Sequence, residues 1–167
     1  DELELTMLNS VVGMHSSTGH WATYDTPMNG IRRASAHTIV FQSREGSPEL
    51  NCCSVNTPRG FGMLSDWGLM KDQEGLVLNY YGPSTITTKL KPGLSVTLVQ
   101  ETEYPLDGKV NIRLKPSKSS VFALKLRIPH WSTNTKVRVN DEVLPTVKAG
   151  NYLKIDRKWK AGDNICV

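Results

Sequence analysis

The second half of the chain alternates apolar and polar residues with a period of two. Val110, Ile112 and Leu114 alternate with Asn111 and Arg113, a pattern that places one face of a strand in a core and the other in water. Turn signals such as KPG, LDG and KAGD separate eight such segments, GLVLNYY, TITTKL, LSVTLVQETEY, KVNIRLK, VFALKLRIP, TKVRVN, NYLKID and NICV. Short strands at this spacing predict an antiparallel β-sandwich and a mainly β fold.

The start of the chain has a helical period instead. Leu3, Met7, Val11 and Met14 recur at steps of four, four and three, which is the spacing of one helix face. Gly13 indicates where this helix ends.

A second helix is predicted after an irregular segment at residues 15–48. We expect Asn56 to cap it and Pro58 to lie in its first turn, with an apolar stripe made by Met63, Leu64, Trp67 and Met70. Two helices and a loop have too few elements to close a core. We therefore interpret residues 1–74 as the end of a larger helical domain and residues 75–167 as a β-sandwich domain.

Composition and charge narrow the class of protein. Hydrophobic residues make up 38% of the 167 residues, which is enough for a buried core. The formal net charge of +4 comes from scattered basic residues, so it does not favour a nucleic-acid partner. No apolar run approaches the ~20 residues of a membrane span, so we expect a soluble chain with no membrane partner. The composition neither requires nor excludes a homodimer.

Two adjacent cysteines carry the candidate chemistry. Cys52 and Cys53 precede the second predicted helix, and the third cysteine, Cys166, lies far along the chain, so a disulfide framework is excluded. The pair could be buried core thiols, zinc ligands or a nucleophile. Its place before a helix N-terminus favours a thiolate over a thiol, because the helix dipole and the unpaired N–H groups stabilise negative charge.

Four ordered phrases make the chain resemble the beta-L-arabinofuranosidase-like proteins of glycoside hydrolase family 127. The phrases are NCCSVNTPR, QETEYPLDG, LRIPHW and RKWKAGD, and together they cover most of the chain. The matching positions are Cys52, Cys53, Asn56 and Arg59 in the first phrase, Thr102, Tyr104, Pro105 and Gly108 in the second, Arg127, Ile128, Pro129 and Trp131 in the third, and Arg157, Trp159, Gly162 and Asp163 in the last.

The resemblance implies a function and site residues. The helices would be the last part of an (α/α)6 barrel, and the parent enzyme would release terminal L-arabinofuranose or a similar sugar from a glycan or glycoprotein with retention of configuration. Cys52 would be the nucleophile and a zinc ligand, and Cys53 a second zinc ligand. Tyr24 would contact the sugar, although a half-buried strand aromatic explains this residue equally well.

The same resemblance implies that parts of the site precede residue 1. The family's Glu-x-Cys zinc ligands and its general acid/base glutamate have no counterpart in this chain, so we interpret it as a fragment of a longer hydrolase that is inactive alone. The alternative is a non-catalytic accessory module that binds carbohydrate through exposed aromatics such as Trp131 and Trp159. Packing against the barrel is the competing explanation for both tryptophans.

Overall fold

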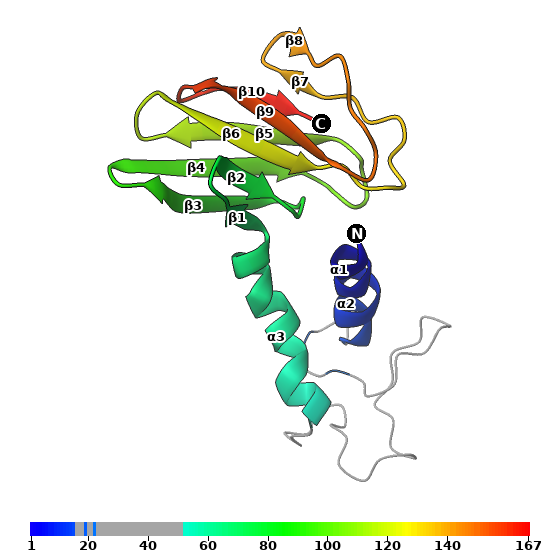
Figure 1. Ribbon diagram of the computed structural model, residues 1–167. Coiled ribbons are helices and arrows are strands. Elements are labelled where there is room, and N and C mark those ends of the chain that lie inside the picture. The colour runs from blue at the N-terminus through cyan, green and yellow to red at the C-terminus, as the bar shows by residue number, and fades with distance from the viewer. Residues whose placement is uncertain (16–18, 20–21, 23–51) are drawn as a thin grey trace, which may run out of the picture. The chain divides into compact units, whose positions relative to one another are not determined.

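The computed structural model describes residues 1–15, 19, 22 and 52–167, with side chains in the second helical segment described from Asn56 onward. The chain divides into two compact units, residues 1–65 and 66–167, each of which is described by itself (Figure 1). In the part of the chain that the structure describes, no helix is both long and apolar enough to cross a membrane.

The predicted first helix is confirmed, and its middle is wound as a π-helix. It consists of α1 (Glu2–Leu5), η1 (Thr6–Val11) and α2 (Val12–Met14). The acidic residues of the first turn complement the positive end of the helix dipole. At His15 the backbone becomes extended, with φ −79° and ψ 145°, which ends the helix just after the position that Gly13 indicates.

The predicted start of the second helix is wrong. Helix α3 (Cys52–Trp67) begins at the cysteine pair and not at Asn56, so Pro58 lies inside the helix. Asn56 as a cap and Pro58 in the first turn suggested the later start, but this proline is accommodated within the helix. Helix α3 ends before Gly68, and the amide of Asn79 donates to the carbonyl oxygen of Trp67 at 2.8 Å. Met70, which was predicted to belong to the apolar stripe of this helix, lies instead in a strand.

The second unit is the predicted sandwich of two sheets, and all eight predicted strands are confirmed (Figure 1). The structure adds two short strands, β1 and β8, which are too brief to show a period in the sequence. The four-stranded sheet has the order β1 (Leu69–Lys71), β2 (Gly75–Leu78), β6 (Ser120–Arg127) and β9 (Tyr152–Trp159). The six-stranded sheet has the order β3 (Ser84–Lys91), β4 (Leu94–Thr102), β5 (Val110–Pro116), β10 (Asn164–Cys166), β7 (Arg138–Val139) and β8 (Glu142–Val143).

One strand pair corrects the expectation of a purely antiparallel sandwich. Strands β2 and β6 run parallel, with Gly75 opposite Ala123 and Leu78 opposite Leu126, whereas every other named pair in this unit is antiparallel. The chain leaves β2, forms β3 to β5 in the other sheet and only then returns as β6. Because no hairpin joins β2 to β6, nothing forces them to be antiparallel.

The core lies between the two sheets. Strand β4 alternates buried and half-buried residues, as its period predicted, and Leu124 and Leu126 of β6 are fully buried. Trp159 at the end of β9 is also fully buried, and its indole N–H donates to the carbonyl oxygen of Phe122 at 3.0 Å. Removing these apolar side chains from water is the main stabilising contribution in the sandwich.

Candidate functional site

The cysteine pair forms the first two residues of α3. The side chains of Cys52 and Cys53, and the whole of Tyr24, lie outside the residues that the structure describes. The backbone nevertheless places the pair in the first helical turn, where N–H groups have no partner within the helix and the dipole is positive. This position is suited to hold negative charge on sulfur.

The first helical segment and α3 pack closely at a point just beyond the pair. The hydroxyl of Thr57, which is buried, donates to the sulfur of Met14 at 3.1 Å. A Cβ added at Gly60 would lie 2.9 Å from both γ-carbons of Val11, so only glycine permits this approach without a shift of the valine. These contacts fix the turn of α3 that follows the cysteines.

Two further residues of the first phrase lie on the solvent side of α3. The guanidinium of Arg59 donates to the side-chain oxygen of Asn56 at 3.1 Å, and both side chains are exposed. Positions 52, 56 and 59 recur at steps of four and three, which is the spacing of one helix face. The first phrase therefore places polar residues along α3 beyond Cys52.

The described residues offer no complete metal site. No group of three or more His, Cys, Asp or Glu side chains that could hold an ion is found among them. His15 is engaged structurally, since Nδ1 lies 2.6 Å from the carbonyl oxygen of Val11 and its ring packs on Phe61 at 5.0 Å. Two thiols are half of a tetrahedral zinc shell, so the donor chemistry of the pair fits zinc only with ligands from elsewhere.

Trp159 belongs to the core of the sandwich, which contradicts the alternative in which it is an exposed, carbohydrate-binding aromatic. The ring is buried beneath the guanidinium of Arg157, whose Cζ lies 5.4 Å from the ring centroid. The turn that follows is held by Asp163, which accepts from the backbone N–H of Lys160 at 2.9 Å. Gly162 has φ +95°, a conformation that favours glycine.

The second and third phrases meet at one groove within the sandwich. Tyr104 and Gly108 of one phrase and Pro129 and Trp131 of the other line a cavity of about 470 Å³. Trp131 is 52% exposed, in contrast to the buried Trp159. The sequence named Trp131 as a candidate but did not indicate that the two phrases share a surface, because about 25 residues separate them.

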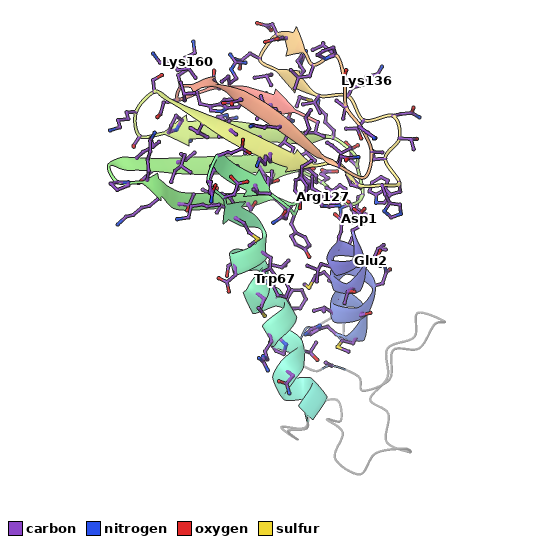
Figure 2. All side chains as sticks on the ribbon, viewed as in Figure 1. Asp1, Glu2, Trp67, Arg127, Lys136 and Lys160 are labelled. Carbon is purple, nitrogen blue, oxygen red and sulfur yellow. The ribbon has the colours of Figure 1, made fainter. Side chains whose placement is uncertain are left out.

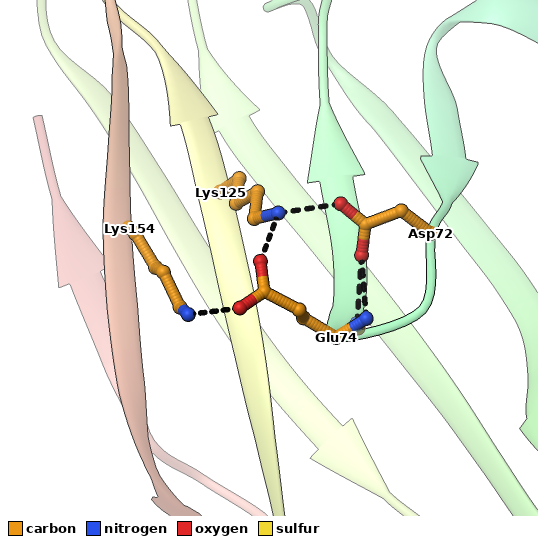
Figure 3. Close-up of polar contacts among 5 residues, drawn as sticks. Asp72, Glu74, Lys125 and Lys154 are labelled. Atoms are coloured by element: carbon orange, nitrogen blue, oxygen red, sulfur yellow. Dashed lines mark hydrogen bonds and ion pairs between the residues drawn. The ribbon is translucent and has the colours of Figure 1, made fainter.

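A cluster of four charged residues joins the turn between β1 and β2 to strands β6 and β9 of the four-stranded sheet (Figure 3). The ammonium of Lys125 lies 2.6 Å from Asp72 and 2.5 Å from Glu74, and Lys154 also pairs with Glu74. Hydrogen bonds from the Lys125 ammonium lower the pKa of both carboxyls, and the two carboxylates, Asp72 first, raise the pKa of Lys125. Every charge is matched, so the cluster fastens the β1–β2 turn to β6 and β9 and leaves no reactive group.

Comparisons with known proteins agree with the fold and the phrases. The family model described as "Beta-L-arabinofuranosidase, GH127 middle domain" matches residues 75–167. No curated protein matches the chain.

Solved structures extend the similarity over both units. A structure titled "Glycoside hydrolase" is 31% identical with a TM-score of 0.80 and covers 98% of this chain. A GH127 beta-L-arabinofuranosidase from Geobacillus stearothermophilus T6 is 28% identical with a TM-score of 0.69 and covers 94% of this chain. A GH127 beta-arabinofuranosidase, 24% identical with a TM-score of 0.75 over 98% of this chain, shows the same fold. The chain spans about a quarter of their lengths, with 27%, 25% and 27% of those chains covered.

Proposed function

The chain belongs to the GH127 beta-L-arabinofuranosidase family, and from this premise we propose that it is part of a retaining glycosidase that releases terminal L-arabinofuranose or a similar sugar. The observation that carries the proposal is the cysteine pair at the first turn of α3, in a chain whose sandwich matches the family's middle domain. The helical unit, residues 1–65, would be the last part of an (α/α)6 barrel, and residues 66–167, which include β1, the sandwich that follows it in the sequence.

Cys52 is the proposed nucleophile. A thiolate at a helix N-terminus is stabilised by the dipole and by N–H groups without helical partners. Its sulfur would attack the anomeric carbon as the glycosidic oxygen departs, and water would then release the sugar from sulfur. Two displacements at one carbon retain its configuration, as in glycosidases that use a carboxylate nucleophile.

The remaining groups of the site would come from outside the described residues. The leaving oxygen needs a proton from a general acid, which we place elsewhere in the full-length protein. Tyr24 would contact the sugar. Zinc held by Cys52, Cys53 and ligands from elsewhere would keep both sulfurs deprotonated at neutral pH.

Replacing Cys52 by Ser in the full-length protein tests the nucleophile. We expect hydrolysis of an aryl L-arabinofuranoside to fall about 10⁴-fold or more, because a serine hydroxyl offers almost no anion at neutral pH. The matched control is Cys166→Ser, a thiol in β10, which should leave this rate unchanged. Undiminished hydrolysis by the Cys52→Ser protein would exclude Cys52 as nucleophile.

Replacing Cys53 by Ser separates the ligand role from the nucleophile role. We expect the zinc content, measured by elemental analysis, to fall first and the rate of hydrolysis to fall with it, because a hydroxyl is a weak zinc ligand. Activity restored by excess zinc would support this order. Full zinc content in an inactive Cys53→Ser protein would contradict it.

A further inference from the structure

Four lysines from three separate segments come together at one end of the sandwich. Lys71 ends β1, Lys89 and Lys91 lie at the end of β3, and Lys118 lies in the turn between β5 and β6. The ammonium of Lys71 donates to the backbone carbonyl oxygen of Lys89 at 3.0 Å, and a Cβ added at Gly93 would lie 3.6 Å from Nζ of Lys118. All four lysines are exposed, and we call them the lysine patch.

The turns that carry the lysine patch are braced against each other. Lys91 pairs with Leu94 across a two-residue turn in which Gly93 has φ +71°. The N–H of Ser117 donates to the carbonyl oxygen of Ser95 at 2.8 Å, and the N–H of Ser95 donates to the hydroxyl of Ser117 at 3.1 Å. The backbone beneath the lysines is thus already ordered, which lowers the entropy lost when a ligand binds there.

A hollow lies between the end of β1 and the β3–β4 turn. Its volume is about 530 Å³, within the range of small-molecule sites, roughly 300 to 1,000 Å³. Among the described residues, Lys71 and residues 89–95 line it, so three of its lining residues belong to the lysine patch. This lining includes no carboxylate, no arginine and no aromatic ring.

The positive charge of the lysine patch is not balanced within the part of the chain that the structure describes. None of the four lysines forms an ion pair with another described residue. Asp72 and Glu74, the carboxylates that follow Lys71 in the sequence, are paired with Lys125 and Lys154 (Figure 3). The acidic residues at the β7–β8 turn lie at the opposite edge of the six-stranded sheet from β3. The patch is therefore open to a negatively charged ligand.

The composition of the patch favours a polymer with repeated charges. An ammonium is a hydrated point charge and does not hold one carboxylate in the bidentate way that arginine does. Several ammonium groups on one surface instead attract a chain of negative charges through their summed field. The hollow also lacks the aromatic rings on which single-stranded nucleic acids stack.

We propose that the lysine patch binds an acidic polysaccharide, a glycan whose carboxylates follow one another along the chain. The choice of a glycan rests on the proposed function, while the choice of negative charge rests on the patch itself. Each carboxylate would meet one exposed ammonium, so the affinity should fall as salt screens the charges.

The test measures polymer binding and hydrolysis separately in the full-length protein. The probe is immobilised polygalacturonate, which carries one carboxylate per sugar, in about 50 mM NaCl, where screening is weak. We expect Lys89→Gln/Lys91→Gln to raise the dissociation constant about fivefold, with hydrolysis of an aryl L-arabinofuranoside unchanged. Lys89→Arg/Lys91→Arg should keep the affinity, because both charges remain. The fully methyl-esterified polymer, which has the same backbone without charge, should bind weakly.

The matched control is Lys109→Gln/Lys136→Gln, which removes the same net charge from two exposed lysines outside the patch. Figure 2 shows Lys136 at the end of the sandwich away from the β3–β4 turn. An unchanged dissociation constant in the Lys89→Gln/Lys91→Gln protein, or an equal rise in the control, would overturn the proposal. Equal binding of the esterified polymer or tighter binding of single-stranded DNA would also overturn it.

Two further outcomes separate this proposal from the proposed function. If the parent does not bind polygalacturonate at all, another part of the full-length protein covers the patch and the proposal fails, whatever the rate of hydrolysis. If binding depends on Lys89 and Lys91 but the aryl glycoside is not hydrolysed, the lysine patch is supported and the proposed glycosidase reaction is contradicted.

Discussion

The two units of this chain bury their apolar residues in different ways. In the sandwich, one cluster of nineteen buried residues joins both sheets, and Leu76, Leu98 and Leu124 are fully buried. Among the described residues of the helical unit, the buried apolar side chains are Met7 and Ala22, while Leu3 and others are exposed.

This difference indicates which unit specifies its own fold. A sheet with one buried face needs a second sheet, and the sandwich supplies both. The described residues of the helical unit form an apolar stripe and no comparable core, so the stability of these helices depends more on what covers them. We expect a substitution of one kind to have unequal effects in the two units.

The largest difference should come from the same substitution made once in each unit. Leu124→Ala, at a fully buried site of β6, should cost about 2 to 5 kcal/mol of unfolding free energy, because it removes buried surface and leaves a cavity. Leu3→Ala, at a site that is 53% exposed, should change it by less than about 0.5 kcal/mol. Urea unfolding followed by circular dichroism measures both. Equal losses would mean that Leu3 is covered.

A smaller difference is expected when a methyl group is added at two glycines. A Cβ at Gly75 would lie 2.0 Å from the backbone oxygen of Ala123 on β6, whereas a Cβ at Gly60 would meet side-chain atoms of Val11 at 2.9 Å. Gly75→Ala should therefore lower the free energy of unfolding by about 1 to 3 kcal/mol or more, because the backbone at the β2–β6 contact must move. Gly60→Ala should lower the free energy of unfolding by less, because the side chain of Val11 can rotate and alanine has a higher helix propensity than glycine.

The control for both glycines is Gly82→Ala, where nothing lies within 4 Å of the new methyl group. It should leave the urea midpoint almost unchanged. A midpoint for Gly75→Ala that matches this control would show that the β2–β6 pairing tolerates displacement.

The smallest effect concerns the charged cluster and its pH dependence. The pKa values of Asp72 and Glu74 are lowered from 3.8 and 4.5, so their contribution to stability is present above those values and is lost as pH falls through the lowered ones. The pKa of Lys125 is raised from 10.5, so its contribution is present below that value and is lost as pH rises through the raised one. The cluster therefore stabilises the sandwich most between about pH 5 and pH 9.

Thermal melts of Lys125→Met across pH measure this contribution. The melting temperature should lie slightly below that of the parent at neutral pH, since exposed ion pairs contribute little. The gap should narrow below pH 4. Lys115→Met, an exposed lysine of β5, is the control and should show a gap that does not vary with pH. A constant gap for Lys125→Met would contradict the assigned role of the cluster.

Much of the sandwich could be predicted because its period is visible in the sequence. Ile155 and Trp159 lie on the same side of β9, so the alternation itself could have indicated that Trp159 is buried. The parallel direction of β2 could not be predicted, because it depends on where the chain returns after three strands in the other sheet. The start of α3 was missed because a proline near a helix start is ambiguous between its first turn and its interior.

The candidate site was predicted less completely than the fold. The sequence indicated the cysteine pair, and the backbone puts that pair in the first turn of α3. The groove at Trp131 is formed by two segments that only the folded sheets bring together, so the local sequence pattern does not predict it.

The parallel pairing of β2 with β6 also affects the kinetics of folding. Each residue of β2 pairs with one 48 positions later in the chain, while β3, β4 and β5 join through short turns. Long-range pairings carry a larger loop-closure entropy and raise the contact order, which slows folding. The β3–β4–β5 meander is thus able to form early and to bring β6 back beside β2, so the rate of folding should be limited by the closure of the four-stranded sheet.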